Sequence, residues 1–272
     1  MTILVTGSEG FIGKNLVKHL RLSHDVIEFT SDTTWKVLKA QLPKIDFIFH
    51  LAGVNRDNEA AITSGNLGLT KKLCTLLSEL DLKTPILLSS STQALEKNVY
   101  GKSKLNAENE LIRFSKKNNS KIIIYRLPNV FGKWCKPNYN SVVATFCHNI
   151  NNNLPISINN PNHSLNLVYI DDVVSSFCNT LEKKLADGIQ YKLVRPVYKI
   201  TLKKLAERLE FYKNSKVGLP ATGKGLDRAL YATFLSYKKT EDFTYKLKEN
   251  IDNRGKFVEL FQTTNSGQFS YF

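Results

Sequence analysis

The fold is decided by TILVTGSEGFIG at residues 2–13. Its first five residues are mostly apolar or β-branched and predict a short strand over Thr2–Thr6. Three glycines follow, and an amphipathic pattern then predicts a helix over Gly10–Leu22. Glycines between a strand and a helix permit a tight turn and a close approach of the backbone to a pyrophosphate at the positive helix end. The stretch therefore predicts a βα unit with a dinucleotide site, although its GxxGxxG spacing departs from the commoner GxGxxG.

The alternation of strand and helix continues downstream. Mostly continuous apolar runs predict strands at Asp25–Thr30, Asp46–His50, Pro85–Ser90 and Lys121–Leu127. Helical patterns lie between them, at Thr34–Leu42, Asn66–Leu80 and Tyr100–Lys117. Continuous apolar strands suit a parallel sheet that helices cover on both faces. The sequence thus predicts an α/β fold with a doubly wound, Rossmann-type parallel sheet.

Beyond Leu127 the pattern is less regular and predicts a smaller C-terminal, substrate-binding lobe, mostly from residue 128 onward. The elements expected there are helices at Ser141–Asn152, Asp171–Lys184 and Thr201–Tyr212 and a strand at Leu165–Ile170. Short strands are expected near the end, at Asp242–Lys246, Lys256–Phe261 and Gln268–Phe272. Such short strands cannot bury a core alone. We therefore expect one domain over residues 1–242, while the strands of residues 243–272 either pack on it or begin a second domain.

Composition excludes several classes of protein. The formal net charge is +14, but the basic residues come as short dispersed pairs and not as one stripe, which argues against a nucleic-acid partner. The four cysteines and five histidines are widely spaced, so no metal site is predicted. No apolar run approaches the roughly 18 residues that span a bilayer, and the N-terminus does not resemble a signal peptide. We expect a cytoplasmic protein without a membrane partner.

The end of the second predicted strand bears on the choice of cofactor. A carboxylate there binds the adenosine ribose and favours NAD. That position falls at Thr30 or Ser31, while strand alternation points Glu28 elsewhere. Because nothing there repels a 2′-phosphate, the sequence favours NADP(H), with Thr30 beside the cofactor. No arginine is obvious in the adjoining loop to bind that phosphate.

A tyrosine and a lysine open the helix predicted at Tyr100–Lys117. Tyr100 and Lys104 are four residues apart, so both side chains lie on one face of the helix. A tyrosine with a pKa of about 10 is a proton donor and a poor base at neutral pH. A lysine ammonium beside it is expected to stabilise the phenolate. The pair therefore predicts a catalytic acid and the cation that tunes it.

Together these motifs resemble the extended short-chain dehydrogenase/reductase family, over about the first 240 residues. The resemblance includes HLAG at 50–53, SSS at 89–91, RLPNVFG at 126–132 and YIDDVV at 169–174. It implies that Tyr100, Lys104 and Ser91 are catalytic. It also implies that the cofactor is bound by Gly7, Gly10, Phe11, Ile12, Gly13, Thr30, Leu51, Ala52, Gly53, Lys104 and Leu127.

A narrower resemblance is carried by FGKWCKPNYNS at residues 131–141, which is similar to the CapF family of bifunctional capsular-polysaccharide enzymes. That family implies NADPH-dependent reduction of the 4-keto group of a UDP-2-acetamido-2,6-dideoxy-hexos-4-ulose. The product is UDP-2-acetamido-2,6-dideoxy-L-talose, on the route to UDP-N-acetyl-L-fucosamine. The substrate would contact Ser91, and the candidates for further contacts are Asn129, Lys133, Asn138 and Asn140.

The segment DNRGKFVE at residues 252–259 resembles the opening of the cupin domain of that family. Because the sequence stops at Phe272, we expect no cupin barrel and no epimerase activity. The family also implies a homodimer, which the absence of a cupin would weaken. Two alternatives stay open: a nucleotide-sugar 4-epimerase or 4,6-dehydratase on the same fold, and a non-catalytic NADP-sensing or nucleic-acid-binding module. Thr92-Gln93 stands where dehydratases carry an acidic pair.

Overall fold

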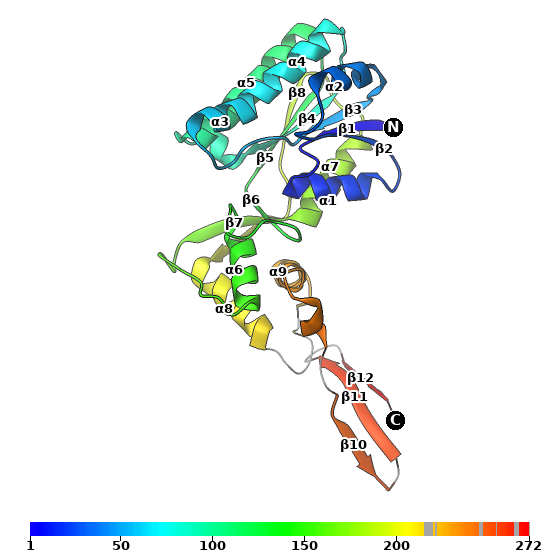
Figure 1. Cartoon of the computed structure of the whole chain (residues 1–272), viewed down its shortest axis with the longest axis vertical. Coiled ribbons are helices and arrows are strands. Elements are labelled where there is room, and N and C mark those ends of the chain that lie inside the picture. Colours follow the sequence, from blue (N-terminus) through cyan, green and yellow to red (C-terminus); the bar gives the residue numbers. More distant parts are fainter. Residues whose placement is uncertain (215–219, 221, 245–246, 254, 264–266, 272) are drawn as a thin grey trace. The chain divides into compact units, whose positions relative to one another are not determined.

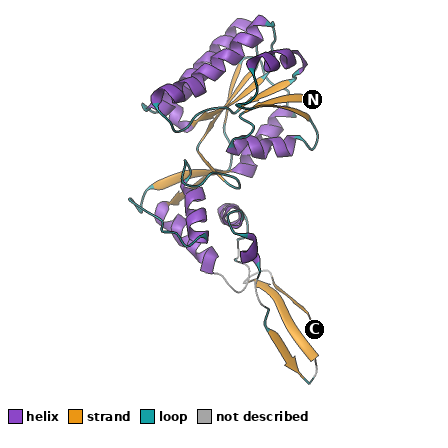
Figure 2. Cartoon of the chain, viewed as in Figure 1, coloured by secondary structure: helices purple, strands orange, loops and turns teal. Residues whose placement is uncertain are grey.

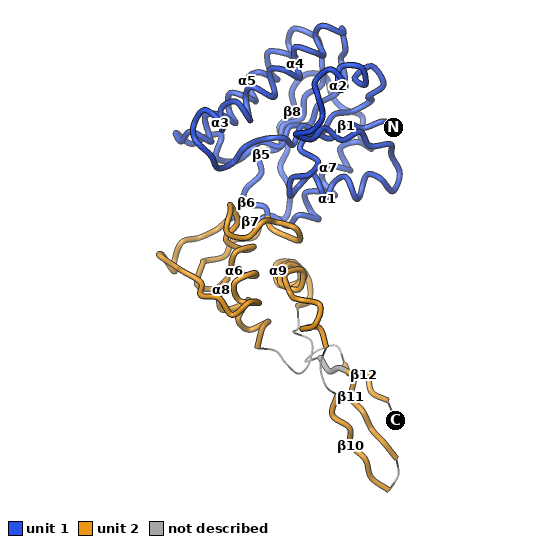
Figure 3. Tube along the Cα trace, viewed as in Figure 1, with its two compact units in different colours: residues 1–130, 166–197 blue, residues 131–165, 198–272 orange. Residues whose placement is uncertain are grey.

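The computed structural model describes residues 1–214, 220, 222–244, 247–253, 255–263 and 267–271. The chain forms two compact units, shown in different colours in Figure 3. The first unit comprises residues 1–130 and 166–197, and the second comprises residues 131–165 and 198–272. The assignment of residues 1–242 to a reductase domain and of residues 243–272 to the start of a cupin stays a prediction.

A six-stranded sheet organises the first unit, and its strands lie in the order β2-β1-β3-β4-β5-β8. Every neighbouring pair is parallel. The strands are β1 Thr2–Thr6, β2 Asp25–Phe29, β3 Phe47–His50, β4 Ile86–Ser91, β5 Ile122–Leu127 and β8 Ile189–Lys192. Since β2 and β3 flank β1 on opposite sides, the loops after β1 and β3 diverge at a topological switch point, where ligands of open α/β sheets bind. This confirms the predicted fold class.

Helices cover both faces of this sheet (Figures 1 and 2). One face carries α1 Phe11–Leu20 and α7 Ile170–Leu181, whose apolar side chains pack with Ile3 and Val5 of β1. The other face carries α2, α4 and α5, which pack with Leu4 of the same strand. Their bounds are Trp35–Gln41, Leu69–Glu79 and Val99–Asn118. Alternating side chains of one strand therefore enter two separate cores, as the continuous apolar runs predict.

The helix predicted to begin at Asn66 begins earlier. Helix α3, Glu59–Thr63, is capped by Asn58, whose side chain accepts a hydrogen bond from the backbone N–H of Ala61 at 2.9 Å. It continues through a π-helical turn, Ser64–Gly68, directly into α4. Asn66 therefore lies inside the helical run, in the π-helical turn, and it is buried. Such turns are frequent at functional sites.

The second unit holds α6 Val142–Asn151, α8 Leu202–Asn214 and α9 Leu226–Leu235. Between α8 and α9, the Tyr212 hydroxyl donates a hydrogen bond to Asp227 Oδ1 at 3.1 Å. A three-stranded sheet has the order β6-β7-β9, with β6 at Asn129–Phe131, β7 at Ser164–Tyr169 and β9 at Tyr198–Thr201. In the described part of the chain, no helix is long and apolar enough to cross a bilayer.

The last strands differ in part from the prediction. Strands β10 Glu249–Asp252, β11 Gly255–Thr263 and β12 Gly267–Tyr271 form an antiparallel sheet. The strand expected at Asp242–Lys246 is wrong at its start, because Thr240–Phe243 is a 3₁₀ helix. Residues 245 and 246 lie outside the described residues. The N–H of Asp242 donates a hydrogen bond to the carbonyl of Lys239 at 3.0 Å, which closes a helical turn in place of a strand.

Candidate active site

The loop after β1 closes tightly on the loop after β3. Gly7 has φ +68°, and its N–H donates a hydrogen bond to the carbonyl of Phe29 at 3.1 Å. A Cβ on Gly7 would lie 2.7 Å from backbone atoms of Ala52. A Cβ on Gly13 would lie 2.2 Å from the carbonyl oxygen of Gly7. Both positions therefore exclude any side chain, which explains two of the three glycines in residues 7–13.

This loop fits the diphosphate of a dinucleotide. Gly10 is the N-cap of α1 and offers no side chain to cap the first N–H groups, which stay available to an anion. The Ser8 hydroxyl is buried and has no hydrogen-bond partner among the described residues. Buried hydroxyls normally have a partner, and a phosphate oxygen would supply one. Phe11 and Ile12 are half-buried in the first turn of α1.

Thr30 directly follows β2, as expected. Its hydroxyl accepts a hydrogen bond from the N–H of Asp32 at 3.3 Å. Glu28 does not face this end of the strand, because it forms an ion pair of 2.5 Å with Arg21. The sequence prediction did not consider Asp32, an exposed carboxylate two residues beyond Thr30. The strand end itself thus carries a hydroxyl, while a carboxylate lies in the following loop.

A buried chain of hydrogen bonds fixes the loop after β3. Thr70 donates its hydroxyl proton to the carbonyl of Asn66 at 2.7 Å, so it accepts from His50 Nε2 at 2.9 Å. His50 Nδ1 is then the acceptor for the Thr6 hydroxyl at 2.8 Å, and Thr6 in turn accepts from the N–H of Ala52 at 3.2 Å. Burial, with a smaller effect of the Lys104 charge, lowers the pKa of His50 to about 3. The imidazole is therefore neutral and holds residues 51–53 in place.

Asn66 holds the next part of this loop and was not predicted as a site residue. Its amide accepts from the N–H of Val54 at 3.2 Å and donates to the Val54 carbonyl at 2.9 Å and to the Ser103 hydroxyl at 3.0 Å. A Cβ on Gly53 would lie 2.5 Å from Asn66 Oδ1 and 3.1 Å from Lys104 Nζ. Asn66 thus places Gly53 against the lysine. Sequence reasoning missed it because a polar residue at a predicted helix start is expected to be a cap.

The catalytic residues expected from the sequence lie together where β4 meets α5. Ser91 hydrogen-bonds the Tyr100 hydroxyl. Lys104 is buried and its ammonium donates to the Ser89 carbonyl at 3.1 Å. Burial lowers the pKa of Lys104 to about 8, and the nearby Glu108 carboxylate opposes this change.

Tyr100 differs from the expectation of a stabilised phenolate. Burial raises the pKa of Tyr100, and the hydrogen bond from Ser91 offsets only part of that rise. The reason is geometric: Lys104 Nζ is 5.9 Å from the centre of the Tyr100 ring and turns instead to the Ser89 carbonyl. The phenol is held in its protonated form, which suits a group that gives up a proton only to a forming alkoxide.

The remaining predicted residues lie further along the chain. Leu127 ends β5, is buried and pairs with Ser91 in the sheet register. Asn129 begins β6 and is exposed. The others lie in the second unit: Lys133, whose ammonium is 5.9 Å from the Trp134 ring, and the exposed Asn138 and Asn140.

The loop that carries these residues has a fixed shape. Trp134 and Asn138 have φ of 68° and 54°, which is uncommon outside glycine. The Tyr237 hydroxyl donates a hydrogen bond to the Cys135 carbonyl, and the N–H of Asn138 donates to the Thr145 hydroxyl at 3.0 Å. Strained backbone that its surroundings hold in place is common at ligand sites.

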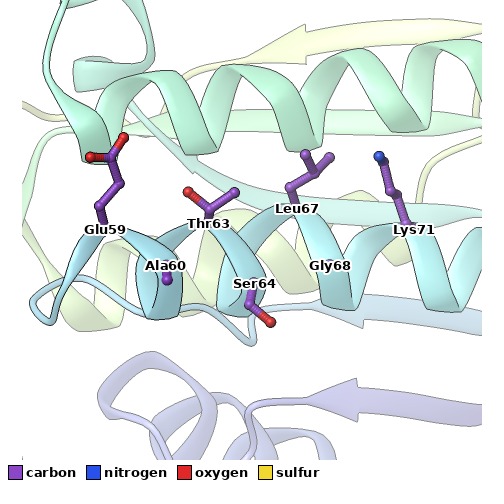
Figure 4. A pocket seen from close by; sticks show the side chains of 7 residues that line it. All are labelled: Glu59, Ala60, Thr63, Ser64, Leu67, Gly68 and Lys71. Atoms are coloured by element: carbon purple, nitrogen blue, oxygen red, sulfur yellow. The ribbon is translucent and has the colours of Figure 1, made fainter.

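A hollow of about 580 Å³ lies elsewhere, along the helical run from α3 to α4 (Figure 4). The side chains of Glu59, Thr63, Leu67 and Lys71 point to the same side of this run, as a spacing of four residues requires. None of the predicted site residues lines it. It is a shallow surface feature and plays no part in the site at β4 and α5.

A comparison with protein families agrees with the features described above, which are the glycine loop, the parallel sheet and the Ser–Tyr–Lys arrangement. The model of the NAD dependent epimerase/dehydratase family matches residues 3–193, so the chain belongs to that family. The resemblance to extended short-chain dehydrogenases/reductases is thereby confirmed.

Individual relatives are more specific. A UDP-2-acetamido-2,6-beta-L-arabino-hexul-4-ose reductase of Pseudomonas aeruginosa is 44% identical over 277 residues, which cover 100% of this chain and 74% of the relative. The capsular polysaccharide assembling protein CapF of Staphylococcus aureus superimposes with a TM-score of 0.87 at 39% identity, over 99% of this chain and 74% of that one. The UDP-glucose 4-epimerase of Thermotoga maritima, at 20% identity and a TM-score of 0.73, covers 87% of this chain and 98% of its own and shares the fold. The resemblance to CapF is confirmed.

Proposed function

We propose that this chain is an NADPH-dependent nucleotide-sugar reductase. Its substrate would be a UDP-2-acetamido-2,6-dideoxy-hexos-4-ulose and its product UDP-2-acetamido-2,6-dideoxy-L-talose. The observation that carries the proposal is the arrangement of Tyr100 with the buried Ser91 and Lys104 beside the loop of residues 51–53. The names of the reductase from Pseudomonas aeruginosa and of CapF support the same chemistry.

The residues of the chain account for the proton that a carbonyl reduction needs. When bound, NADPH supplies a hydride to the carbonyl carbon, and the oxygen becomes an alkoxide. Tyr100 donates its phenol proton to that oxygen, and Ser91 hydrogen-bonds the same atom. Lys104, whose ammonium donates to the Ser89 carbonyl and lies 5.9 Å from the centre of the Tyr100 ring, would hold the nicotinamide ribose. The raised pKa of Tyr100 before the reaction keeps the proton in place until hydride arrives.

Cofactor binding falls to the loop at residues 7–13 and the loop at residues 51–53. The Ser8 hydroxyl and the open N-terminus of α1 would take the diphosphate. Thr30 would lie near the adenosine ribose, where its hydroxyl tolerates a 2′-phosphate better than a carboxylate would. NADPH is therefore the proposed reductant.

Substrate binding is proposed for the loop of residues 131–141. Lysines and exposed aromatic rings alternate there, with the Lys136 ammonium 5.6 Å from the Tyr139 ring. Ammonium groups suit a diphosphate and aromatic faces suit a nucleobase. Asn129, Lys133, Asn138 and Asn140 are the proposed contacts to the sugar and diphosphate.

The test is steady-state oxidation of NADPH with a panel of UDP-linked 4-keto sugars, with product identified by NMR. We expect one NADPH consumed per sugar reduced, with the 2-acetamido-2,6-dideoxy-4-keto sugar as the best substrate. A 4-epimerase would instead interconvert sugars without net consumption of cofactor. Absence of turnover with every 4-keto sugar would contradict the proposal.

A further inference from the structure

Three consecutive serines of β4 each meet a different residue of α5. Ser91 hydrogen-bonds the Tyr100 hydroxyl, and the Ser89 carbonyl accepts from Lys104 Nζ. The Ser90 hydroxyl donates to Glu108 Oε1 at 2.5 Å. Tyr100, Lys104 and Glu108 succeed one another at intervals of four, so they lie along one face of the helix. Glu108 therefore lies on the same face as Tyr100 and Lys104, one turn beyond Lys104, and the proposed function assigns it no role.

The Glu108 carboxylate is fully buried and held from several sides. Arg126 on β5 donates from Nε to Oε1 at 3.0 Å and from Nη2 to Oε2 at 2.6 Å. The Tyr191 hydroxyl on β8 lies 3.5 Å from Oε2, and the Tyr191 ring lies 4.8 Å from the Arg126 guanidinium. A bidentate arginine fixes both the position and the orientation of a carboxylate.

A buried carboxylate at this place needs an explanation beyond packing. Removing a carboxylate from water is expensive, and replacing a whole buried ion pair by apolar side chains of similar volume is often neutral or stabilising. The pair is also one helical turn from an ammonium that burial pushes towards its neutral form. An opposite charge nearby is what keeps a buried ammonium charged.

The charged and titratable groups around Lys104 define what Glu108 can do. From β3 comes His50, which is neutral, and from β4 the Ser89 carbonyl. From α5 come Tyr100, which burial keeps protonated, and Glu108. Behind Glu108 lie Arg126 of β5 and Tyr191 of β8. Among these groups Glu108 carries the negative charge. The positive charge of Arg126, which is paired with Glu108, reduces the effect of that negative charge on Lys104.

We propose that Glu108 is a positioning residue whose buried carboxylate keeps Lys104 charged for the reaction, while Arg126 limits how strongly it does so. The proposal rests on the proposed function, since it assigns a purpose to the charge on Lys104. It predicts opposite effects from the two partners of one ion pair. Loss of Glu108 removes the negative charge that acts on Lys104, whereas loss of Arg126 leaves the Glu108 carboxylate without its counter-charge.

The experiment compares Glu108→Gln and Arg126→Gln in the dependence of kcat/KM on pH. Activity should fall on the alkaline side as Lys104 loses its proton, near pH 8 in the unaltered protein. We expect this alkaline limb to move down by about one pH unit in Glu108→Gln and up by a similar amount in Arg126→Gln. Ser90→Ala is the matched control, because it removes one hydrogen bond but keeps both charges; its limb should move by less than half as much.

A second measurement does not depend on turnover. The pH dependence of Lys104 labelling by an amine-selective reagent, read by mass spectrometry, reports its ionisation in each folded variant. The shifts should have the same opposite signs as the kinetic ones. If the labelling shifts have opposite signs in the two variants while no 4-keto sugar is reduced, the proposed function fails, but the effect of Glu108 on Lys104 is still supported.

Two outcomes would overturn the proposal and mean that the Glu108–Arg126 pair is structural. In one, the alkaline limb shifts equally in both variants. In the other, turnover falls while neither the alkaline limb nor the pH dependence of Lys104 labelling moves. Should Glu108→Gln fail to fold, the upward shift in Arg126→Gln decides. It is read in protein whose circular dichroism spectrum and Tm match those of the unaltered protein, because exposure of Lys104 to water would also raise its pKa. An unmoved or lowered limb in that folded variant overturns the proposal.

Discussion

Thr6 Oγ1 and His50 Nδ1 lie 2.8 Å apart, and this hydrogen bond joins the carboxyl ends of β1 and β3. The two strands part at this point into the loops at residues 7–13 and 51–53. Because both ring nitrogens of His50 are engaged inside the protein, Nδ1 can accept a proton only if the Thr6 hydroxyl no longer donates to it. The junction between the two loops is therefore sensitive to acid.

His50 should make the protein less stable as the pH falls. Its pKa is about 3 in the folded protein and about 6.5 when unfolded, so the unfolded state alone takes up a proton between these values. Stability should then fall by about 1.4 kcal/mol per pH unit below pH 6.5 from this residue alone. Between pH 7 and pH 5, the free energy of unfolding in urea should fall by about 2 kcal/mol less in His50→Gln than in the unaltered protein. The exposed His163→Gln is the control, and an equal loss in all three proteins would refute this.

Burial of the Lys104 ammonium should lower the stability of the folded protein. Its pKa is about 8 when folded and about 10.5 when unfolded, so below pH 8 folding must bury an ammonium that prefers water. Stability should rise with pH between 8 and 10.5, because only the unfolded state then holds that proton. Lys104→Met should be inactive yet unfold thermally at or above the temperature of the unaltered protein at pH 7. Lys102→Met, exposed on the same helix, should leave both properties unchanged. A lower Tm for Lys104→Met alone would show that the lysine stabilises the fold.

Tyr100→Phe should abolish reduction and leave NADPH affinity nearly unchanged. The hydroxyl is the proton donor in the proposed reaction, whereas the ring adds little to cofactor binding. A positioned acid contributes typically 10²–10⁴-fold, so turnover should fall by at least about 100-fold. Tyr231→Phe removes the same hydroxyl from a tyrosine of α9 and should leave turnover intact. A loss below about tenfold in Tyr100→Phe would remove Tyr100 from the role of acid.

Thr30→Asp should move the cofactor preference from NADPH towards NADH. The new carboxylate repels a 2′-phosphate and offers a partner to ribose hydroxyls. Asp32→Asn is the matched test of the carboxylate already present two residues further on, and it should change the preference little. Calorimetric titration of all three proteins with both cofactors provides the measurement. Equal affinity for NADPH and NADH in the unaltered protein would refute the preference for NADPH.

Regular backbone was the most predictable part of this protein. The strand at Thr2–Thr6 has the predicted bounds, and the other five apolar or alternating runs up to Leu165–Ile170 became strands within one residue at either end. Hydrophobic periodicity reports burial directly, so it succeeds where packing decides structure. It failed for the short strands β6, β8 and β9, whose positions depend on partners that are distant in the sequence, and for the helix α9.

The candidate site could be predicted where the sequence spacing of two residues already brings their side chains together. Tyr100 and Lys104 are visible as a pair because one helix presents both. Asn66 and Glu108 hydrogen-bond to residues far away in the sequence, Ser103 and Arg126, and nothing local distinguishes them from a cap or a surface carboxylate. The pKa of Tyr100 also escaped prediction, because burial outweighs a lysine that points to another partner.

The order of strands in the first sheet also has a consequence for synthesis. Strand β8 pairs with β5, but it is encoded at residues 189–192, after α6 and β7. A chain emerging from the ribosome must therefore carry the apolar edge of β5, with Ile122, Ile123 and Ile124, unpaired while residues 128–188 are translated. An unpaired strand edge is a template for wrong pairing. For this protein, translation speed between these two strands governs how long the nascent chain is open to aggregation.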